Sequence, residues 1–211
     1  MSRTRFRRQI TDLGASLFAR GLSPGRTGNI SVRTDDCILL TPTGASLGAL
    51  EPEELSVLSL DGTHLDGPRP SKEAFLHLAM YRSRPADTAV VHLHSPYAVA
   101  LSCLDPDDAS DVLPPLTAYY ALRVGTLPLL PYHAPGDERL GPIAAKSAQQ
   151  HHALLLANHG PLAAGRDLAA TADVIEELEA TAKIHLVLRG MPTRPLTSEQ
   201  LDTLHAGASQ K

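Results

Sequence analysis

The chain has 211 residues, of which 43% are hydrophobic and 20% charged; this excludes a disordered or fibrous protein and predicts one folded domain over 1–211. A net charge of −4 argues against a general nucleic-acid binder. The apolar runs fall far short of the ~20 residues of a membrane-spanning helix, so no membrane segment is expected. Two cysteines, Cys37 and Cys103, make no disulfide framework and favour a reducing cytoplasm. Cys103 is expected to be buried.

The first half of the chain predicts two helices separated by short strands. Apolar residues at spacings of three and four indicate a helix over 3–20 that ends at Gly21. Ser71 is a good N-cap for a second helix over 72–82. Between these helices the pattern predicts strands at 29–33 and 38–41, a helical turn at 51–54, and a hairpin from 57–60 and 64–65.

The second half continues the alternation of helices and strands. The β-branched, apolar run 88–94 predicts a strand, and the proline-rich stretch 114–135 predicts short extended pieces. The remaining predicted elements are helices at 97–103, 137–152, 168–189 and 198–205, a strand at 153–156, and a turn at 158–160. This alternation indicates one α/β or α+β domain.

Histidine is unusually frequent, with ten residues in the chain, and two of them form the pair His92-Leu93-His94. On a strand, residues i and i+2 point to the same face, so both imidazoles can reach one metal ion. By chance, a chain of this composition would contain about 0.5 such pairs on average. Taken alone, the pair is therefore explained equally well by two half-buried histidines bonded to the backbone.

A third histidine and a glutamate strengthen the metal interpretation. Asn158-His159-Gly160 directly follows a predicted buried strand, where a glycine lets the chain turn sharply. Three histidines with an open position suit a catalytic divalent transition metal, with zinc first by ligand type. Glu73 and His77 are four residues apart and would share one helix face. A helix-surface contact or a buried helix histidine is the alternative explanation for that pair.

Three turn-like segments could together bind an anion. They contain Gly28 and Asn29, Thr43 and Gly44, and Ser71 and Lys72, which offer backbone amides, hydroxyl groups and one cation. Ser71 would open a helix, where free N–H groups favour phosphate. Each segment alone also fits an ordinary turn. The sequence contains neither a P-loop nor a dinucleotide-binding fingerprint, so neither ATP nor NAD is expected.

Taken together, these motifs resemble the class II aldolase/adducin family in order and approximate spacing. The motifs that carry the resemblance are Gly28-Asn29-Ile30-Ser31, Thr41-Pro42-Thr43-Gly44, Pro70-Ser71-Lys72-Glu73, His92-Leu93-His94 and Asn158-His159-Gly160. The resemblance implies a three-layer αβα domain with a largely antiparallel sheet, assembled as a homotetramer with active sites between subunits.

The resemblance also implies roles for individual residues. His92, His94 and His159 would hold zinc, and Glu73 would carry a proton and serve as a fourth ligand before substrate arrives. Phosphate would be bound by the segments described above, at Gly28, Asn29, Thr43, Gly44 and Ser71. A tyrosine from a neighbouring subunit would assist, with Tyr119 and Tyr120 as the candidates.

One departure from the aldolase pattern narrows the resemblance. Aldolases of the family commonly have a second serine where this chain has Lys72. The Ser-Lys-Glu segment, with 116–120 and 176–183, is most similar to the 3-oxo-tetronate 4-phosphate decarboxylase branch. That branch implies decarboxylation of a small phosphorylated keto acid to dihydroxyacetone phosphate and CO2 through a metal-stabilised enediolate. A fuculose-phosphate-type aldolase, a ribulose-phosphate-type epimerase and a non-catalytic adducin-like interaction module remain the alternatives.

Overall fold

The computed structural model describes residues 3–208, in which eight strands form one sheet in the order β4-β3-β2-β1-β5-β8-β7-β6. All neighbouring strands are antiparallel except β6 and β7, which are parallel. The strands are β1 (Asn29–Arg33), β2 (Ile38–Leu40), β3 (Ser56–Leu58), β4 (His64–Asp66), β5 (Ala89–His92), β6 (Leu129–Leu130), β7 (Ala153–Leu156) and β8 (Gly160–Gly165). The predicted, largely antiparallel sheet is therefore confirmed.

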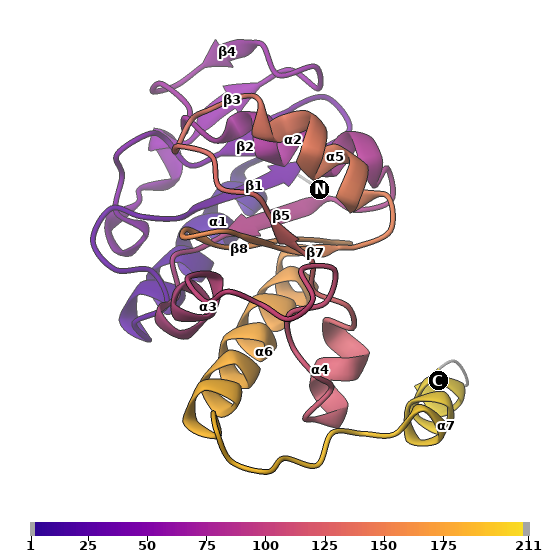
Figure 1. Cartoon of the computed structure of the whole chain (residues 1–211). Helices are drawn as coiled ribbons and strands as arrows, with labels where there is room; N and C mark the ends of the chain where they lie inside the picture. The colour runs from indigo at the N-terminus through magenta and orange to yellow at the C-terminus, as the bar shows by residue number, and fades with distance from the viewer. Residues whose placement is uncertain (1–2, 209–211) are drawn as a thin grey trace.

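Helices cover both faces of this sheet and complete three layers (Figure 1). One face carries α1 (Arg3–Ala19), α3 (Pro96–Ser102), α4 (Ala118–Arg123) and α6 (Leu168–Val187), and the other carries α2 (Ala74–Ser83) and α5 (Leu140–Ala148). The last helix, α7 (Ser198–Ala208), contacts α4. Short 3₁₀ turns occupy Leu47–Ala49 and Pro52–Glu54.

Alternating strand residues create the two cores of the αβα arrangement. In β7, Ala153 and Leu155 belong to the core beneath α1, α3 and α6, whereas Leu154 and Leu156 belong to the core beneath α2 and α5. This follows from the two-residue period of a strand whose faces are both buried. The αβα layering implied by the resemblance is confirmed. Within the described residues, no helix is long and apolar enough to cross a membrane.

Two elements were missing from the sequence prediction. Inside the proline-rich stretch, Thr117 accepts a hydrogen bond from the Tyr120 amide at 3.1 Å and caps α4. This local cap forms a helix where only extended pieces were predicted. Strand β8 begins and ends with glycine and contains a proline, so it carries little strand propensity. It exists because β5 and β7 pair with it on both sides.

Other predicted elements are longer than the observed ones. Helix α5 covers Leu140–Ala148 rather than 137–152, and β5 ends at His92 rather than at 94. Cys103 is the C-cap of α3 and is exposed, which corrects the prediction that it is buried. The helix predicted from residue 72 begins at Ala74, and its N-cap is Glu73 rather than Ser71. The Ser71 amide instead donates to the Thr41 carbonyl at 3.3 Å, which holds the segment outside the helix.

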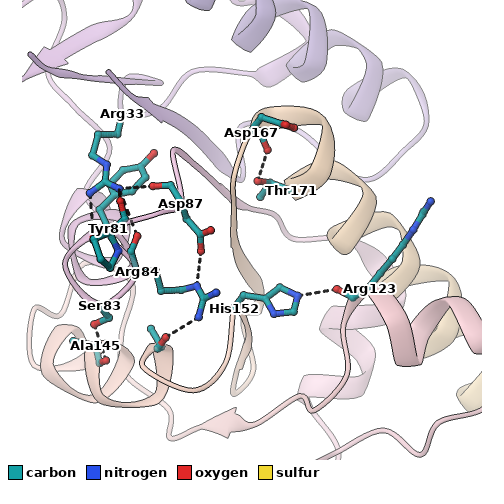
Figure 2. Close-up of polar contacts among 12 residues, drawn as sticks. Arg33, Tyr81, Ser83, Arg84, Asp87, Arg123, Ala145, His152, Asp167 and Thr171 are labelled. Carbon is teal, nitrogen blue, oxygen red and sulfur yellow. Dashed lines mark hydrogen bonds and ion pairs between the residues drawn. The ribbon is translucent and has the colours of Figure 1, made fainter. Parts of the chain in front are cut away.

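A polar cluster connects the C-terminal end of α2 to the sheet and to α5 (Figure 2). The Arg33 guanidinium donates to the carbonyls of Tyr81 and Asp87 and lies 4.9 Å from the centre of the Tyr81 ring. Arg84 pairs with Asp87, and Ser83 donates to the Ala145 carbonyl at 2.8 Å. Since α2 is held at this end, Glu73 at its other end is presented from a rigid element.

Candidate active site

The predicted metal ligands come together at one edge of the sheet. Glu73, His92, His94 and His159 each offer a ligand atom, and these atoms all lie within 4.8 Å of one another. His92 is the last residue of β5, His94 follows two residues later, and His159 lies in the turn that precedes β8. Because β5 and β8 are paired neighbours, the ends of two strands deliver all three imidazoles to one place.

Two glycines allow this close approach. Gly28 has φ 77°, and a Cβ there would lie 2.9 Å from the His92 carbonyl oxygen. Gly160 has φ 151°, and a Cβ there would lie 2.3 Å from the Leu93 carbonyl oxygen. Both conformations favour glycine, and both glycines pack against the segment between the histidines. The glycines of two motifs therefore shape the histidine site directly.

His92 presents an unprotonated nitrogen to the centre of the cluster. The Nδ1–H of His92 donates to the Pro161 carbonyl at 2.8 Å, which leaves its Nε2 lone pair facing the site. Within the described chain, Nε2 of His92 and Nε2 of His159 are buried and have no hydrogen-bond partner. Burial lowers the pKa of His92, and it lowers the pKa of His94 to about 4. Neutral imidazole is the form that binds metal.

Glu73 completes the cluster with a negative charge. Its two carboxylate oxygens lie 3.1 Å from His159 Nε2 and 3.4 Å from His92 Nε2, and Asn29 Nδ2 donates to it at 2.8 Å. Burial alone would raise the pKa of Glu73, but these neighbours outweigh burial and hold the pKa well below its usual range. Buried imidazole nitrogens without partners, together with a carboxylate, fit a divalent transition metal.

A cavity of about 250 Å³ opens on this cluster and is lined by all three predicted anion-binding segments. The predicted residues that line it are Gly28, Asn29, Thr43, Gly44, Ser71 and Lys72. Backbone contacts hold two of the segments together: Pro42 and Pro70 form an isolated bridge, and the Thr43 amide donates to the Arg69 carbonyl at 3.0 Å. Segments far apart in the sequence thus form one pocket beside Glu73, His94 and His159.

The structure changes the expected roles of two pocket residues, Ser71 and Asn29. Ser71 does not open the helix, and its Oγ accepts from the Glu73 amide at 3.3 Å, so the helix-N-terminus argument for phosphate does not apply to Ser71. The side chain of Asn29 is engaged on both sides, by Glu73 and by His77, whose Nε2 lies 2.5 Å from Asn29 Oδ1.

Sequence reasoning missed one cation of the pocket. Arg26 lines the cavity together with Lys72, and neither side chain has a hydrogen bond or ion pair within the described residues. In the sequence, Arg26 is an ordinary loop residue; its position just before Thr27-Gly28 was the only available signal. The pocket thus contains two cations without partners, beside a carboxylate that is already engaged.

The two candidate tyrosines lie on α4 and do not line this cavity. Tyr120 is 1% exposed and packs in the core of its own chain, so it is not available to the active site of a neighbouring chain. Tyr119 is 63% exposed, with the Arg123 guanidinium 5.3 Å from its ring centre. Of the two, only Tyr119 has the exposure that a contribution to a neighbouring site requires.

Comparison with known proteins agrees with this geometry. Residues 8–186 match the class II aldolase and adducin N-terminal domain. The chain belongs to this family. It is 48% identical over 204 residues to the 3-oxo-tetronate 4-phosphate decarboxylase of Pectobacterium atrosepticum, covering 96% of this chain and 94% of that protein. It is 32% identical to the L-fuculose phosphate aldolase of Haemophilus influenzae, covering 97% and 94%.

Solved structures of the family share the fold closely. The chain matches the crystal structure of YgbL from Escherichia coli, described as an aldolase/epimerase/decarboxylase, with a TM-score of 0.93 at 43% identity, covering 96% of this chain and 98% of that one. An L-fuculose 1-phosphate aldolase matches with a TM-score of 0.86 at 28% identity, covering 96% and 95%. Identity is therefore higher toward the decarboxylase-named relatives than toward the aldolases.

Proposed function

We propose that this protein is a metal-dependent carbon–carbon lyase that decarboxylates 3-oxo-tetronate 4-phosphate to dihydroxyacetone phosphate and CO2. The observation that carries the proposal is the Glu73–His92–His94–His159 cluster, which shares one cavity with the cations Arg26 and Lys72. Curated relatives from three bacteria at 45–48% identity are named for this reaction and support the substrate class.

In this proposal, His92, His94 and His159 hold the metal, and zinc is the ion best suited to three neutral imidazoles. When bound, such an ion supplies a Lewis acid that stabilises negative charge on a substrate oxygen as a carbon–carbon bond breaks. The chain's own contribution is to fix the rings: the Pro161 carbonyl sets the His92 tautomer, and Gly160 admits the backbone that carries His94.

Glu73 is the proposed proton carrier. Loss of CO2 from the keto acid leaves an electron pair on carbon, and that carbon must gain a proton to give the product. Glu73 begins as a carboxylate, so it must first take up the proton that it delivers, from the substrate hydroxyl or from water. Its position against His92 and His159 supports a role at the reacting carbons rather than at the phosphate end of the pocket.

The pocket would hold the remote phosphate and the substrate carboxylate. Lys72 and Arg26 supply positive charge, and the turns at Gly28, Thr43 and Gly44 supply backbone amides. Holding the remote phosphate fixes the reacting carbons against the metal, which lowers the entropic part of the barrier. A substrate with two anionic groups suits a pocket with two cations better than a sugar phosphate, whose phosphate is its only anionic group.

A fuculose-phosphate-type aldolase or a ribulose-phosphate-type epimerase is the second candidate, favoured by relatives such as the Haemophilus aldolase. A non-catalytic adducin-like module is disfavoured because all four cluster residues are in place. We further propose a homotetramer in which the exposed Tyr119 reaches a neighbouring site. A cytoplasmic location is supported by the two free cysteines.

The proposal is tested by incubating zinc-loaded protein separately with 3-oxo-tetronate 4-phosphate, fuculose 1-phosphate and ribulose 5-phosphate. Cleavage products are identified by mass, and an epimer of ribulose 5-phosphate, which has the same mass, by NMR. We expect CO2 and a triose phosphate from the keto acid, at a kcat/KM at least tenfold above that for either sugar phosphate. Release of an aldehyde from fuculose phosphate at the higher kcat/KM would establish the aldolase instead.

A further inference from the structure

A chain of buried polar side chains runs from Glu73 through the interior to the far end of α2. Asn29 Nδ2 donates to Glu73 Oε2 at 2.8 Å, and Asn29 Oδ1 lies 2.5 Å from His77 Nε2. His77 Nδ1 lies 2.7 Å from Ser31 Oγ, which lies 2.7 Å from the Tyr81 hydroxyl. All five residues are buried, with exposed fractions from 0% at Ser31 to 7% at Glu73. None but Glu73 belongs to the metal cluster.

The hydrogen bonds among these five side chains all run in one donor-to-acceptor direction. An ionised carboxylate only accepts, so the NH2 group of Asn29 must face Glu73, and its Oδ1 must face His77. Oδ1 only accepts, so His77 Nε2 carries the hydrogen. Burial holds the pKa of His77 at about 3, so the ring is neutral and its Nδ1 accepts from the Ser31 hydroxyl. The single Ser31 proton is then used, so the Tyr81 hydroxyl donates to Ser31 Oγ at 2.7 Å rather than to the Thr88 carbonyl, which is farther away at 3.4 Å.

The Tyr81 end of the chain is held independently of the active site. Burial raises the pKa of the Tyr81 hydroxyl far above its usual range, so the hydroxyl remains a donor. The Arg33 guanidinium lies over the Tyr81 ring and donates to its carbonyl at 3.2 Å (Figure 2). Since hydrogen bonds in a buried chain reinforce one another, this fixed end favours one orientation at every link.

We infer that His77 is a positioning residue, which orients the Asn29 amide so that its NH2 group holds Glu73 Oε2 in place for proton transfer. Asn29 provides the only side-chain hydrogen bond to the Glu73 carboxylate among the described residues. Without His77, Asn29 Oδ1 loses its donor, and the amide is free to rotate away from the carboxylate. This inference rests on the proposed function only for the step that Glu73 performs.

The kinetic test uses His77→Leu, His77→Gln and the control Leu76→Val, which alters a buried apolar neighbour on the same helix. His77→Leu is expected to lower kcat about 10- to 100-fold, the usual effect of removing a partner outside the ligand shell, with KM and metal content unchanged. His77→Gln restores a donor to Asn29 Oδ1 and is expected to recover most of kcat. Leu76→Val should keep wild-type kcat. A His77→Leu protein with wild-type kcat would overturn the inference.

A second measurement does not depend on activity or on His77 variants that fold. Nitrogen-15 NMR of the histidine-labelled wild-type protein at pH 7 is expected to show His77 as the neutral tautomer with its proton on Nε2. A charged ring, or the proton on Nδ1, would overturn the inference even if every kinetic result agreed. If the wild-type protein releases no CO2 from the keto acid phosphate, the proposed function fails. The His77 tautomer would still test the direction of the hydrogen bonds between Tyr81 and Glu73.

Discussion

Replacing Gly160 by alanine is expected to damage the metal site through the backbone alone. The new Cβ would lie 2.3 Å from the Leu93 carbonyl oxygen, a contact with backbone that no side-chain rotation relieves. Forcing extra volume into a packed interior costs about 1–3 kcal/mol, and a non-glycine residue in a rare backbone region costs about 1–3 kcal/mol more. Gly160→Ala should therefore lose about 2–6 kcal/mol of unfolding free energy.

Part of that strain is expected to appear as displacement of His94, because Leu93 connects the two ligands that flank it. The assay is urea denaturation together with zinc content after purification. Gly190→Ala is the matched control, since Gly190 also has a positive φ, 80°, but a Cβ added there would meet nothing within 4 Å. The control should lose only the backbone part, about 1–3 kcal/mol, and keep full metal content. A Gly160→Ala protein as stable and as zinc-rich as Gly190→Ala would refute this reasoning.

Three further predictions concern the cluster and its pocket. Glu73→Gln should keep zinc and the fold but lose at least about 100-fold in kcat, the contribution expected of a general acid–base group; near-wild-type turnover would remove Glu73 from that role. His92→Ala should purify with less than one zinc per chain, and stoichiometric zinc measured by mass spectrometry would show that His92 is not an essential ligand. Lys72→Met removes a cation from the pocket and should raise KM for the keto acid phosphate about 10-fold or more, since a hydrogen bond to a charged group contributes about 1.5–3 kcal/mol. The same change at Lys146, an exposed residue on α5 outside the cavity, should leave KM unaltered.

The sequence allowed most of the metal cluster to be predicted, because motif spacing and strand ends carry that information locally. His92, His94 and His159 do meet, with His94 two residues beyond the assigned end of β5. The predicted strand 153–156 matches β7 because an apolar run in a doubly buried strand is a strong local signal.

What could not be predicted depends on contacts between distant segments. Ser71 has the local chemistry of an N-cap, but a backbone bond to Thr41 keeps it outside α2. Strand β8 is specified by its two neighbours rather than by its own residues. Arg26 becomes a pocket residue only because the loop before β1 and the turn that carries Lys72 line the same cavity. In each of these cases the decisive contact joins segments that periodicity along the chain does not relate.

The most direct test of the central claim uses 3-oxo-tetronate 4-phosphate labelled with carbon-13 at the carboxyl carbon, incubated with zinc-loaded protein in deuterium oxide. We predict that all of the label leaves as CO2, in a one-to-one ratio with dihydroxyacetone phosphate that carries a single new deuterium on carbon. Label retained in a carbon–carbon cleavage product, or no release of CO2 from protein with full zinc content, would contradict it.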